Sequence, residues 1–600
     1  MNIIDEYKTR VAGLAEEVER IRVRFAYLYL ARFVTFLVAV GCVLLAFSGD
    51  CEWWEVTLAV GSFIAFLVLV KVDSIQSAKR EFLQRKLEVN REELRVIDFD
   101  FANRGDGAEY AHISPYLMAD FDIVGRGSLF QYLNRSVTRK GERLFIDNLC
   151  REELDADMIR LKQQAIKELA EKVEFVQDFH TRGSFFEESD EEFKYLQRWT
   201  SEREDANCYR VVKALSILVP AISIVWLGLY LTGVLAFSTI WGALIVNIIL
   251  SSWNMRAINR NHARLGRATK VIKKYSQLIA MLEGEEFKSE YLNRVKGELS
   301  VEGSSASVQI CKLRKLLNLF DNRNNLFSIL VLNGVYGFNV QIFRNLLSWK
   351  ERYGAEVERW INAISEFDAL LGYGVYAYNN RGVTTSPIIN DGDKFSIEAK
   401  GMAHPLISDK VCVANDISIT KSPAIIIITG ANMAGKSTFL RTVAVNMILG
   451  MNGSVVAASG FSFTPAKILS SIKIQDSLAK NESYFYAEIS RLRDIVDMVN
   501  ADGLKLVVLD EILRGTNNKD KQIGSLGLLQ KLINNNAIVF IATHDLVIGE
   551  LEQQYPDVAR NYCFEVELED NKLLFDYKLK DGVSQKLNAS FLLRDMGLID

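Results

Sequence analysis

The sequence predicts a C-terminal α/β domain joined to a mostly α-helical region with two transmembrane helical hairpins. Two observations predict this combination. Long apolar runs occur as two closely spaced pairs in the first half of the chain, and basic residues flank each pair. A β-branched run, 424–428, is followed by a glycine-rich turn and a helical apolar pattern, which is the order strand, loop, helix. A chain of 600 residues has room for roughly three or four domains.

Composition narrows the class of protein. The formal net charge is −4, so any contact with nucleic acid must depend on local basic patches. The seven cysteines are scattered and include no C-x-x-C pair. This pattern argues against a disulfide framework and a zinc site, and it suits a reducing compartment.

The first pair of apolar runs lies in an N-terminal helical region that we place at 1–109. The runs predict membrane helices at about 30–48 and 54–70. Trp53 and Trp54 lie between them, as suits a membrane interface. The apolar segment starts too far from the beginning of the chain for a cleavable signal peptide.

The second pair interrupts a helical region that we place at 110–378. Its first run, 214–231, would form a helix of about 27 Å, close to the roughly 30 Å thickness of the hydrocarbon core. The return run is 235–251. Any single run is also compatible with a buried core helix, but the pairing and the basic flanks favour four membrane helices.

Positive charge sets the predicted topology. Lys and Arg are absent from the loops at the two hairpin tips, so both tips face outward and both chain termini, with the C-terminal domain, are cytoplasmic. Six basic residues after the second hairpin recur every three or four residues, which predicts one helix face. This face meets either anionic lipid or DNA phosphates; the sequence favours lipid and leaves both open. The six residues are Arg256, Arg260, Arg264, Arg267, Lys270 and Lys274.

The turn after the run 424–428 fits the phosphate-binding pattern G-x-x-x-x-G-K-[ST]. Gly430 and Gly435 let backbone N–H groups face phosphate oxygens, and the N-terminus of the following helix adds positive charge. Lys436 is expected to reach the β- and γ-phosphates, and the Ser437 hydroxyl to ligate Mg²⁺. The sequence therefore predicts ATP and Mg²⁺ as cofactors.

Two further buried strands end in residues that suit the same site. The run 505–511 ends in Asp510 and Glu511. In phosphate-loop ATPases a strand-end Asp holds the Mg²⁺ shell and an acidic neighbour polarises the attacking water, so Asp510 is a predicted metal ligand and Glu511 a predicted catalytic residue. The run 537–544 ends in His544, which we predict to sense the γ-phosphate.

These motifs resemble those of the MutS family of DNA mismatch-repair ATPases, a branch of the ABC-type ATPases. The loop 429–438 resembles TGPNMGGKST, with Ala431 and Ala434 as departures. The segment 510–516 resembles DE-[LI]-G-R-G-T, with Leu513 in place of glycine. Further likenesses are an ATHY-like switch at 542–545, lead-in segments at 404–407 and 413–417, and the opening of the family's core and lever region at 127–143.

The resemblance implies an ABC-type P-loop ATPase domain at 379–600 and a core and lever region at 110–378. It also implies a homodimer. Ser483 lies in a segment, 476–488, that is similar to the family signature, and it would reach the γ-phosphate bound by the partner subunit. The implied ATP contacts of the chain itself are Gly430, Asn432, Met433, Gly435, Lys436, Ser437, Thr438 and Tyr577.

Some positions depart from the family pattern. Asn481 or Glu482 replaces the signature glycine, and Cys412 aligns with the aromatic residue that stacks on adenine. Tyr577 sits where the family often has an opposing aromatic or histidine. The mismatch-binding domain would precede residue 110, where the first hairpin lies, and the DNA clamp is not recognisable. An F-x-E motif at 185–187 lies downstream of the core opening, and we interpret it as coincidence.

These features favour a membrane-associated MutS-like ATPase that acts on mismatched, branched or recombining DNA. One alternative is a membrane mechanoenzyme that moves its hairpins without DNA, but the apolar runs contain no ionisable residue to mark a substrate path. Another is a scaffold with a degenerate site, which the intact Lys436, Asp510 and Glu511 argue against. The sequence leaves open whether mismatches are recognised, and which DNA structure is preferred.

Overall fold

The computed structural model describes residues 3–48, 53–151, 154–202, 206–253, 255–301, 303–321, 328–390, 395–420, 423–473, 484–501, 503–535, 537–569 and 572–584. It divides into two compact units. One unit contains Met1–Asp106 with Val173–Arg182, and the other contains Gly107–Lys172 with Gly183–Asp600. Each is described by itself.

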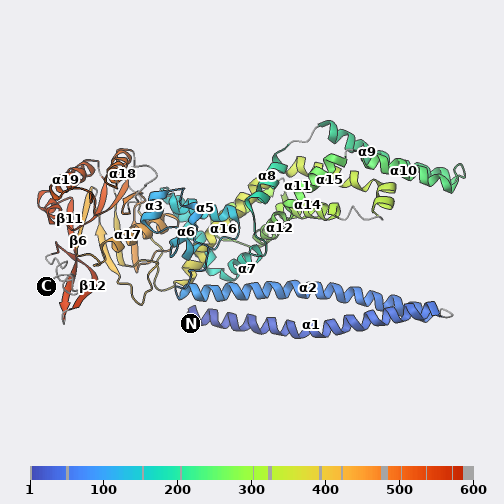
Figure 1. Ribbon diagram of the computed structural model, residues 1–600, viewed down its shortest axis with the longest axis horizontal. Helices are drawn as coiled ribbons and strands as arrows, with labels where there is room; N and C mark the ends of the chain where they lie inside the picture. Colours follow the sequence, from blue (N-terminus) through green and yellow to red (C-terminus); the bar gives the residue numbers. More distant parts are fainter. Residues whose placement is uncertain are drawn as a thin grey trace. The chain divides into compact units, whose positions relative to one another are not determined.

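The first unit is a long antiparallel hairpin of two helices, α1 (Ile3–Ser48) and α2 (Trp53–Ile97), with most of α7 (Val173–Gly183) (Figure 1). Both helices run well beyond the predicted spans because the charged segments beside the apolar runs keep helical spacing without a proline. A partly buried ion pair joins them, with Arg32 Nη1 2.5 Å from Asp73 Oδ2. Toward the tip, apolar side chains such as Phe33 and Leu67 are exposed.

Three described helices are long and apolar enough to cross a membrane: Ile3–Leu45, Val56–Ile97 and Asn207–Leu231. Their most apolar windows are 6%, 0% and 17% buried within the protein, so these surfaces face outward. A fourth span would be Phe237–Ser251 together with Met255–Arg267, two helices bent by 58°. The predicted return run 235–251 is thus a short helix that ends in a sharp bend.

The second unit begins as a helical region centred on α16 (Glu356–Asn379), which packs against α5 (Arg139–Cys150) and α6 (Ala156–Glu171). Close approach needs glycine here: a Cβ on Gly372 would lie 2.4 Å from the Leu133 carbonyl oxygen. The other helices are α3 (Pro115–Asp120), α4 (Leu129–Leu133), α8 (Asp190–Ser201), α9 (Ala206–Leu231), α10 (Ile240–Ser251), α11 (Met255–Arg267), α12 (Thr269–Gly284), α13 (Glu290–Gly297), α14 (Ala306–Asp321) and α15 (Phe338–Tyr353), with a π-helix, η4 (Ser328–Tyr336), and a two-stranded pair, β1 (Ser300–Val301) and β2 (Ser304–Ser305).

The predicted basic face over 256–274 is wrong at its end. The helix breaks at Ala268, between α11 and α12, and the break changes the direction in which later residues point. Lys274 is only 2% exposed. Its ammonium donates hydrogen bonds to the carbonyl oxygens of Val137 and Phe186 and lies 3.3 Å from the Glu188 carboxylate. Lys274 therefore belongs to the protein core, and only the earlier basic residues remain available to lipid or DNA.

The motif at 127–143 forms a joint between helices. Asp368 on α16 accepts hydrogen bonds from the N–H groups of Val137 and Thr138 and from the Thr138 hydroxyl, at 2.7–3.1 Å. Thr138 also caps α5 by accepting a hydrogen bond from Gly141 N–H. A Cβ on Gly141 would lie 2.3 Å from Asp368 Oδ2, so this joint requires glycine.

The C-terminal domain is built on a six-stranded sheet with the order β12-β11-β6-β10-β9-β8. The inner pairs are parallel and β12 is antiparallel at one edge. A second sheet has the order β3-β7-β4-β5. The strands are β3 (Ile388–Ile389), β4 (Ile397–Met402), β5 (Asn415–Ile419), β6 (Ala424–Gly430), β7 (Gly460–Phe463), β8 (Lys467–Ser471), β9 (Lys505–Asp510), β10 (Ile538–Thr543), β11 (Ala559–Glu569) and β12 (Lys572–Asp581).

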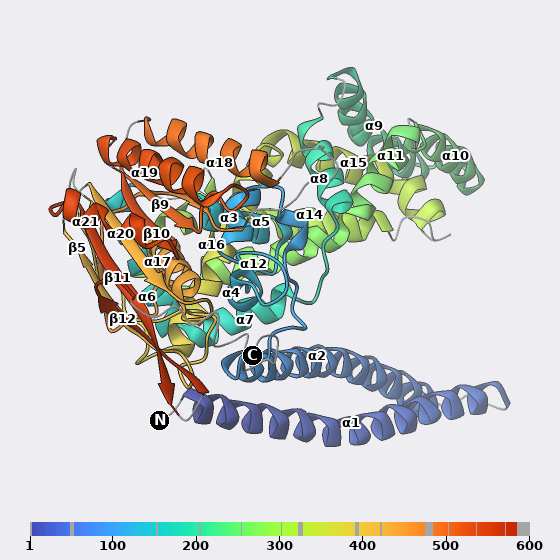
Figure 2. The same ribbon diagram turned by 60° about the vertical axis from the view of Figure 1, so that its left-hand side comes forward.

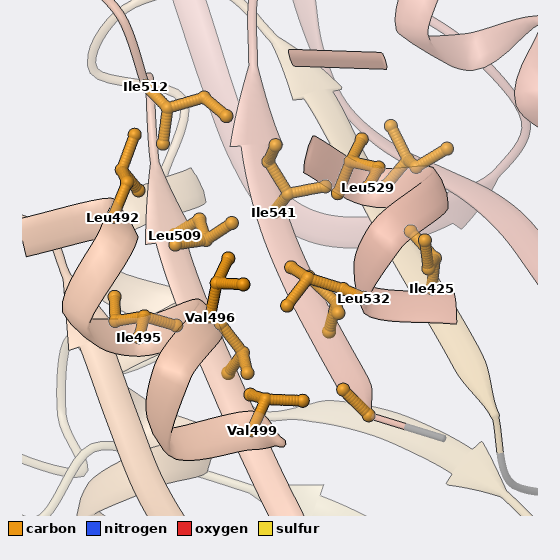
Figure 3. Close-up of a cluster of buried hydrophobic side chains, with 14 of the residues drawn as sticks. Ile425, Leu492, Ile495, Val496, Val499, Leu509, Ile512, Leu529, Leu532 and Ile541 are labelled. Atoms are coloured by element: carbon orange, nitrogen blue, oxygen red, sulfur yellow. The ribbon is translucent and has the colours of Figure 1, made fainter. Parts of the chain in front are cut away.

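Helices cover both faces of the larger sheet, which explains why β6, β9 and β10 are buried along their whole length. On one face, Ile425, Leu509 and Ile541 pack against α18 (Tyr484–Val499) and α19 (Asn518–Asn534) (Figures 2 and 3). Alternate strand residues point to the other face, where α17 (Lys436–Met451) contacts the same strands. Two short helices, α20 (Leu546–Gly549) and α21 (Leu551–Gln554), follow β10.

Candidate functional site

The glycine-rich loop joins the end of β6 to the start of α17, as the sequence predicts. Both of its glycines are required by geometry. A Cβ on Gly430 would lie 2.6 Å from the Phe564 carbonyl oxygen, and Gly435 has φ 108°, a left-handed conformation, at the N-cap of α17. Met433 also has positive φ, 67°, and its side chain is 76% exposed. The loop thereby leaves the positive N-terminal end of α17 open to a bound anion.

Lys436 is held inside the loop. Its Nζ donates hydrogen bonds of 2.9 Å to the carbonyl oxygens of Gly430 and Ala431. The side chain is buried, and burial lowers the pKa of its ammonium. The ammonium therefore lies at the floor of the loop. Bound β- and γ-phosphates would place negative charge beside it and so favour its charged form.

Strand register brings the predicted acidic residues to this loop. Thr429 of β6 is level with Thr543 of β10, and Ala542 is level with Asp510 of β9. Since parallel strands end at the same edge of the sheet, Asp510 and the residue after it reach the loop. Residues as far apart in the chain as Thr429 and Thr543 thus meet at one edge of the sheet.

Asp510 and Ser437, the two predicted Mg²⁺ ligands, form a hydrogen bond with each other. Burial raises the pKa of the Asp510 carboxyl, and among the described residues its Oδ1 is buried without a hydrogen-bond partner. A buried carboxylate oxygen beside a hydroxyl suits a hard cation, which commonly takes few protein ligands and completes its shell with phosphate and water oxygens. The pair fits Mg²⁺ on this observation.

Glu511 and His544 are in direct contact, with 2.7 Å between Glu511 Oε1 and His544 Nε2. This hydrogen bond lowers the pKa of Glu511 to about 2. The same ring nitrogen lies 2.6 Å from Asn432 Oδ1 and 3.3 Å from Lys436 Nζ. His544 therefore links the loop to Glu511, and Glu511 itself has φ 47°, a strained conformation for a residue with a side chain.

Asn432, Lys436 and Glu511 border a pocket of about 530 Å³, and His544 contacts all three of them. Asn432, Met433, Gly435, Lys436, Ser437, Thr438, Glu511 and Tyr577 line it, so the structure brings together the predicted ATP contacts. Gly430 and Asp510 lie beneath it through their contacts with Lys436 and Ser437. Ser483, Asn481 and Glu482 lie outside the described residues.

Both positions at which the resemblance implies contact with a nucleotide base belong to this pocket. Cys412 and Tyr577 both line it, although only Tyr577 offers a ring; that ring is stacked on Phe575 with 5.9 Å between centroids. The sequence reasoning missed His404 and Phe564 as lining residues. His404 begins the lead-in segment 404–407. Burial lowers its pKa to about 4, so its imidazole is neutral at pH 7. Phe564 carries no motif signal.

Leu513 explains one departure from the family pattern. It adopts φ 58°, a backbone conformation that favours glycine. Its N–H donates a hydrogen bond of 2.5 Å to Glu488, which is 1% exposed on α18. A Cβ on Gly524 would lie 2.7 Å from the Leu513 side chain, so the glycine on α19 makes room for the leucine.

A buried ion pair joins the helical region to this domain. Arg491 of α18 contacts Asp120 at the end of α3, and the two side chains are 4% and 0% exposed. Asp120 also accepts hydrogen bonds from Ile472 N–H at 3.3 Å and Lys473 N–H at 2.7 Å. Next to it, Asp122 pairs with Lys473 and with Arg441 of α17. No motif in the sequence indicates this joint, whose residues Lys473 and Arg491 flank the segment 476–488 that contains Ser483.

Comparison with known proteins agrees with this geometry. The family model "MutS domain V" matches residues 426–591. DNA mismatch repair protein MutS of Thermotoga maritima is 31% identical over 40% of this chain and 29% of its own length. MutS of Flavobacterium psychrophilum is 31% identical over 41% of this chain and 28% of its own. Human MutS protein homolog 4 is 29% identical over 43% and 28%.

The chain spans less than a third of the length of each of these relatives. The similar part includes the loop, the strand ends at Asp510 and Thr543, and α17 to α19. Residues 426–591 are therefore similar to domain V of MutS proteins, and the likeness concerns this domain.

Proposed function

We propose that the chain is a membrane-associated MutS-like ATPase that binds and hydrolyses ATP in a head-to-head homodimer and acts on DNA. The observation that carries the proposal is the convergence of Lys436, the Ser437–Asp510 pair and Glu511 on one pocket. The two bacterial relatives, which are named DNA mismatch repair proteins, support mismatched DNA as the substrate. Branched or recombining DNA is the other substrate class that we propose.

In this proposal the loop binds the phosphates of ATP. The N-terminus of α17 attracts them, and Lys436 moves its hydrogen bonds from the two loop carbonyls to the β- and γ-phosphate oxygens. Ser437 and Asp510 hold Mg²⁺, which when bound neutralises phosphate charge. Tyr577, which lines the same pocket as Cys412, contacts the base.

Glu511 positions the attacking water. Its carboxylate is ionised at neutral pH because the hydrogen bond from His544 holds its pKa at about 2. So low a pKa makes Glu511 a weak base, so its role is to orient and polarise the water rather than to remove a proton beforehand. His544, which also contacts Asn432 of the loop, passes a change at the γ-phosphate to Glu511.

The membrane part of the proposal rests on the exposed apolar helices. α1, α2 and α9 cross the bilayer, with the segment around α10 as the return of the second hairpin, and the chain termini lie on the cytoplasmic side. The regions 1–109, 110–378 and 379–600 then act as anchor, lever and ATPase domain. Ser483 of each subunit completes the site of the other.

ATP turnover by the full chain in lipid nanodiscs tests this proposal. Turnover is measured without DNA and with perfectly paired, mismatched and four-way DNA, using Lys436→Ala as the inactive control. We expect mismatched or four-way DNA to stimulate turnover more than paired DNA does. Turnover that is intact but indifferent to all DNA would refute the DNA part and favour a mechanoenzyme that moves its hairpins.

A further inference from the structure

The second apolar hairpin has a third partner. The π-helix η4 packs against both α9 and α10, although it lies about 80 residues further along the chain than α10. Its sequence, SILVLNGVY, contains no charged residue. Contact is close: a Cβ on Gly334 would lie 2.8 Å from the Leu244 side chain, and one on Gly337 would lie 3.0 Å from Val219.

Side chains of the hairpin donate hydrogen bonds to the end of this π-helix, where backbone carbonyls run out of partners within the helix. Three consecutive carbonyl oxygens accept them: Asn333 O from Ser251 Oγ at 3.3 Å, Gly334 O from Asn247 Nδ2 at 2.9 Å, and Val335 O from Ser223 Oγ at 2.7 Å. Asn333 O also accepts from the Gly337 N–H at 3.2 Å.

These three donors are polar side chains in otherwise apolar helices. Ser223, Asn247 and Ser251 lie within the apolar runs of α9 and α10, and Asn247 is 1% exposed. Asn247 Nδ2 also lies 2.9 Å from Ser223 Oγ, so the two helices and η4 share one polar seam. Irregular backbone at membrane depth persists only where protein satisfies its polar groups, and this seam meets that requirement.

The depth of the segment follows from its partner. Ser223 is the tenth residue of the apolar run 214–231, which places it about 13 Å along the helix and near the middle of the run. Val335, whose carbonyl meets Ser223, therefore reaches the same level. The Val335 and Tyr336 side chains are 46% and 52% exposed, so the hairpin does not cover them.

We infer that residues 328–337 form a re-entrant membrane segment that enters the bilayer beside α9 and α10 and presents Val335 and Tyr336 to lipid acyl chains. The inference rests on the proposed membrane placement of α9. The segment would be an intramembrane part of the lever region. It is directly continuous with α15, so a movement of α15 would move residues inside the bilayer.

Cysteine protection tests this placement. Val335→Cys, Val225→Cys on α9 and Val308→Cys on α14 are three valine substitutions at sites that are 46%, 61% and 50% exposed in the protein alone. Each full-length variant is placed in proteoliposomes made leaky by freeze–thaw and treated with a charged maleimide. Peptide mass spectrometry reads each site separately, so the native cysteines can remain.

We expect Cys at 335 and 225 to react at least about tenfold more slowly than Cys at 308, because a thiol in hydrocarbon cannot ionise to the reactive thiolate. All three should react alike after the protein is unfolded in urea and detergent. Protection at 225 with fast reaction at 335 would overturn the inference and leave the membrane proposal standing. Fast reaction at both 225 and 335 would overturn both.

Discussion

The buried pair Asp120–Arg491 makes a strong prediction about how the helical region is held to the ATPase domain. In Asp120→Asn the side chain keeps its shape but loses its charge. One carboxylate oxygen becomes an NH₂ group that faces the donors Arg491, Ile472 N–H and Lys473 N–H. Arg491 keeps its hydrogen bonds of 2.9 Å to the Ser470 and Lys473 carbonyls, so its charge stays buried without a counterion.

We expect Asp120→Asn to lower the free energy of unfolding of this part of the protein by about 3–5 kcal/mol, the cost of leaving one partner of a buried ion pair alone. Asp122→Asn is the matched control, because Asp122 is two residues away and 43% exposed. Its pairs with Lys473 and Arg441 should contribute less than about 1 kcal/mol.

Hydrogen exchange read by mass spectrometry measures both variants in the full chain. Peptides that cover 115–122 and 466–473 should lose protection in Asp120→Asn and keep it in Asp122→Asn. Adding Arg491→Met to Asp120→Asn removes the stranded charge and should recover part of the loss, on the order of 1–3 kcal/mol of coupling. Equal effects of the two Asp→Asn variants, or strictly additive losses in the double variant, would refute this reasoning.

Three further predictions follow from the site and its core. His544→Asn should lower ATP turnover on the order of tenfold or more and leave ATP affinity unchanged, because Glu511 loses the hydrogen-bond donor that orients it. An equally large loss of ATP affinity in a nucleotide-binding assay would contradict this. Stability should fall as pH is lowered from 6.5 to about 4. His404 binds a proton in this range only in the unfolded chain, because its pKa in the folded protein is about 4. The urea midpoint should therefore depend less on pH in His404→Gln, and an unchanged pH dependence would exclude His404 as the cause. Leu509→Ala should lower the free energy of unfolding by about 2–5 kcal/mol, because it opens a cavity in the core shown in Figure 3. Urea unfolding measures this loss against the exposed control Leu546→Ala. A loss no larger than that of the control would show that the neighbouring side chains fill the cavity.

The elements around the pocket were predictable from sequence. The apolar run 424–428 became β6, and the runs 505–511 and 537–544 became β9 and β10 with ends shifted by a residue at most, apart from the longer end of β6. Buried parallel strands need apolar side chains on both faces, so they stand out as continuous runs. The predicted site residues lie at or directly after the ends of these strands, and the register of the sheet brings the strand ends together.

Long-range polar contacts were not predictable. Asp120 and Arg491 are 371 positions apart, and charged residues at that separation have no shared pattern that would reveal a buried pair. The three- and four-residue spacing predicts that Lys274 shares a surface with the earlier basic residues. That spacing defines one helix face only while the helix continues, and the helix is interrupted at Ala268. The segment 328–337 has too few residues to span a bilayer, so its partnership with α9 and α10 appears only in the fold.

ATP binding and single-turnover hydrolysis by Glu511→Gln, compared with the unchanged chain, test the central claim most directly. The substitution keeps the shape of the side chain but removes the carboxylate that polarises water. We expect the variant to bind Mg²⁺-ATP with undiminished affinity and to hydrolyse it at least about 100-fold more slowly. Hydrolysis at the rate of the unchanged chain would contradict the assignment of this pocket as a MutS-type ATPase site.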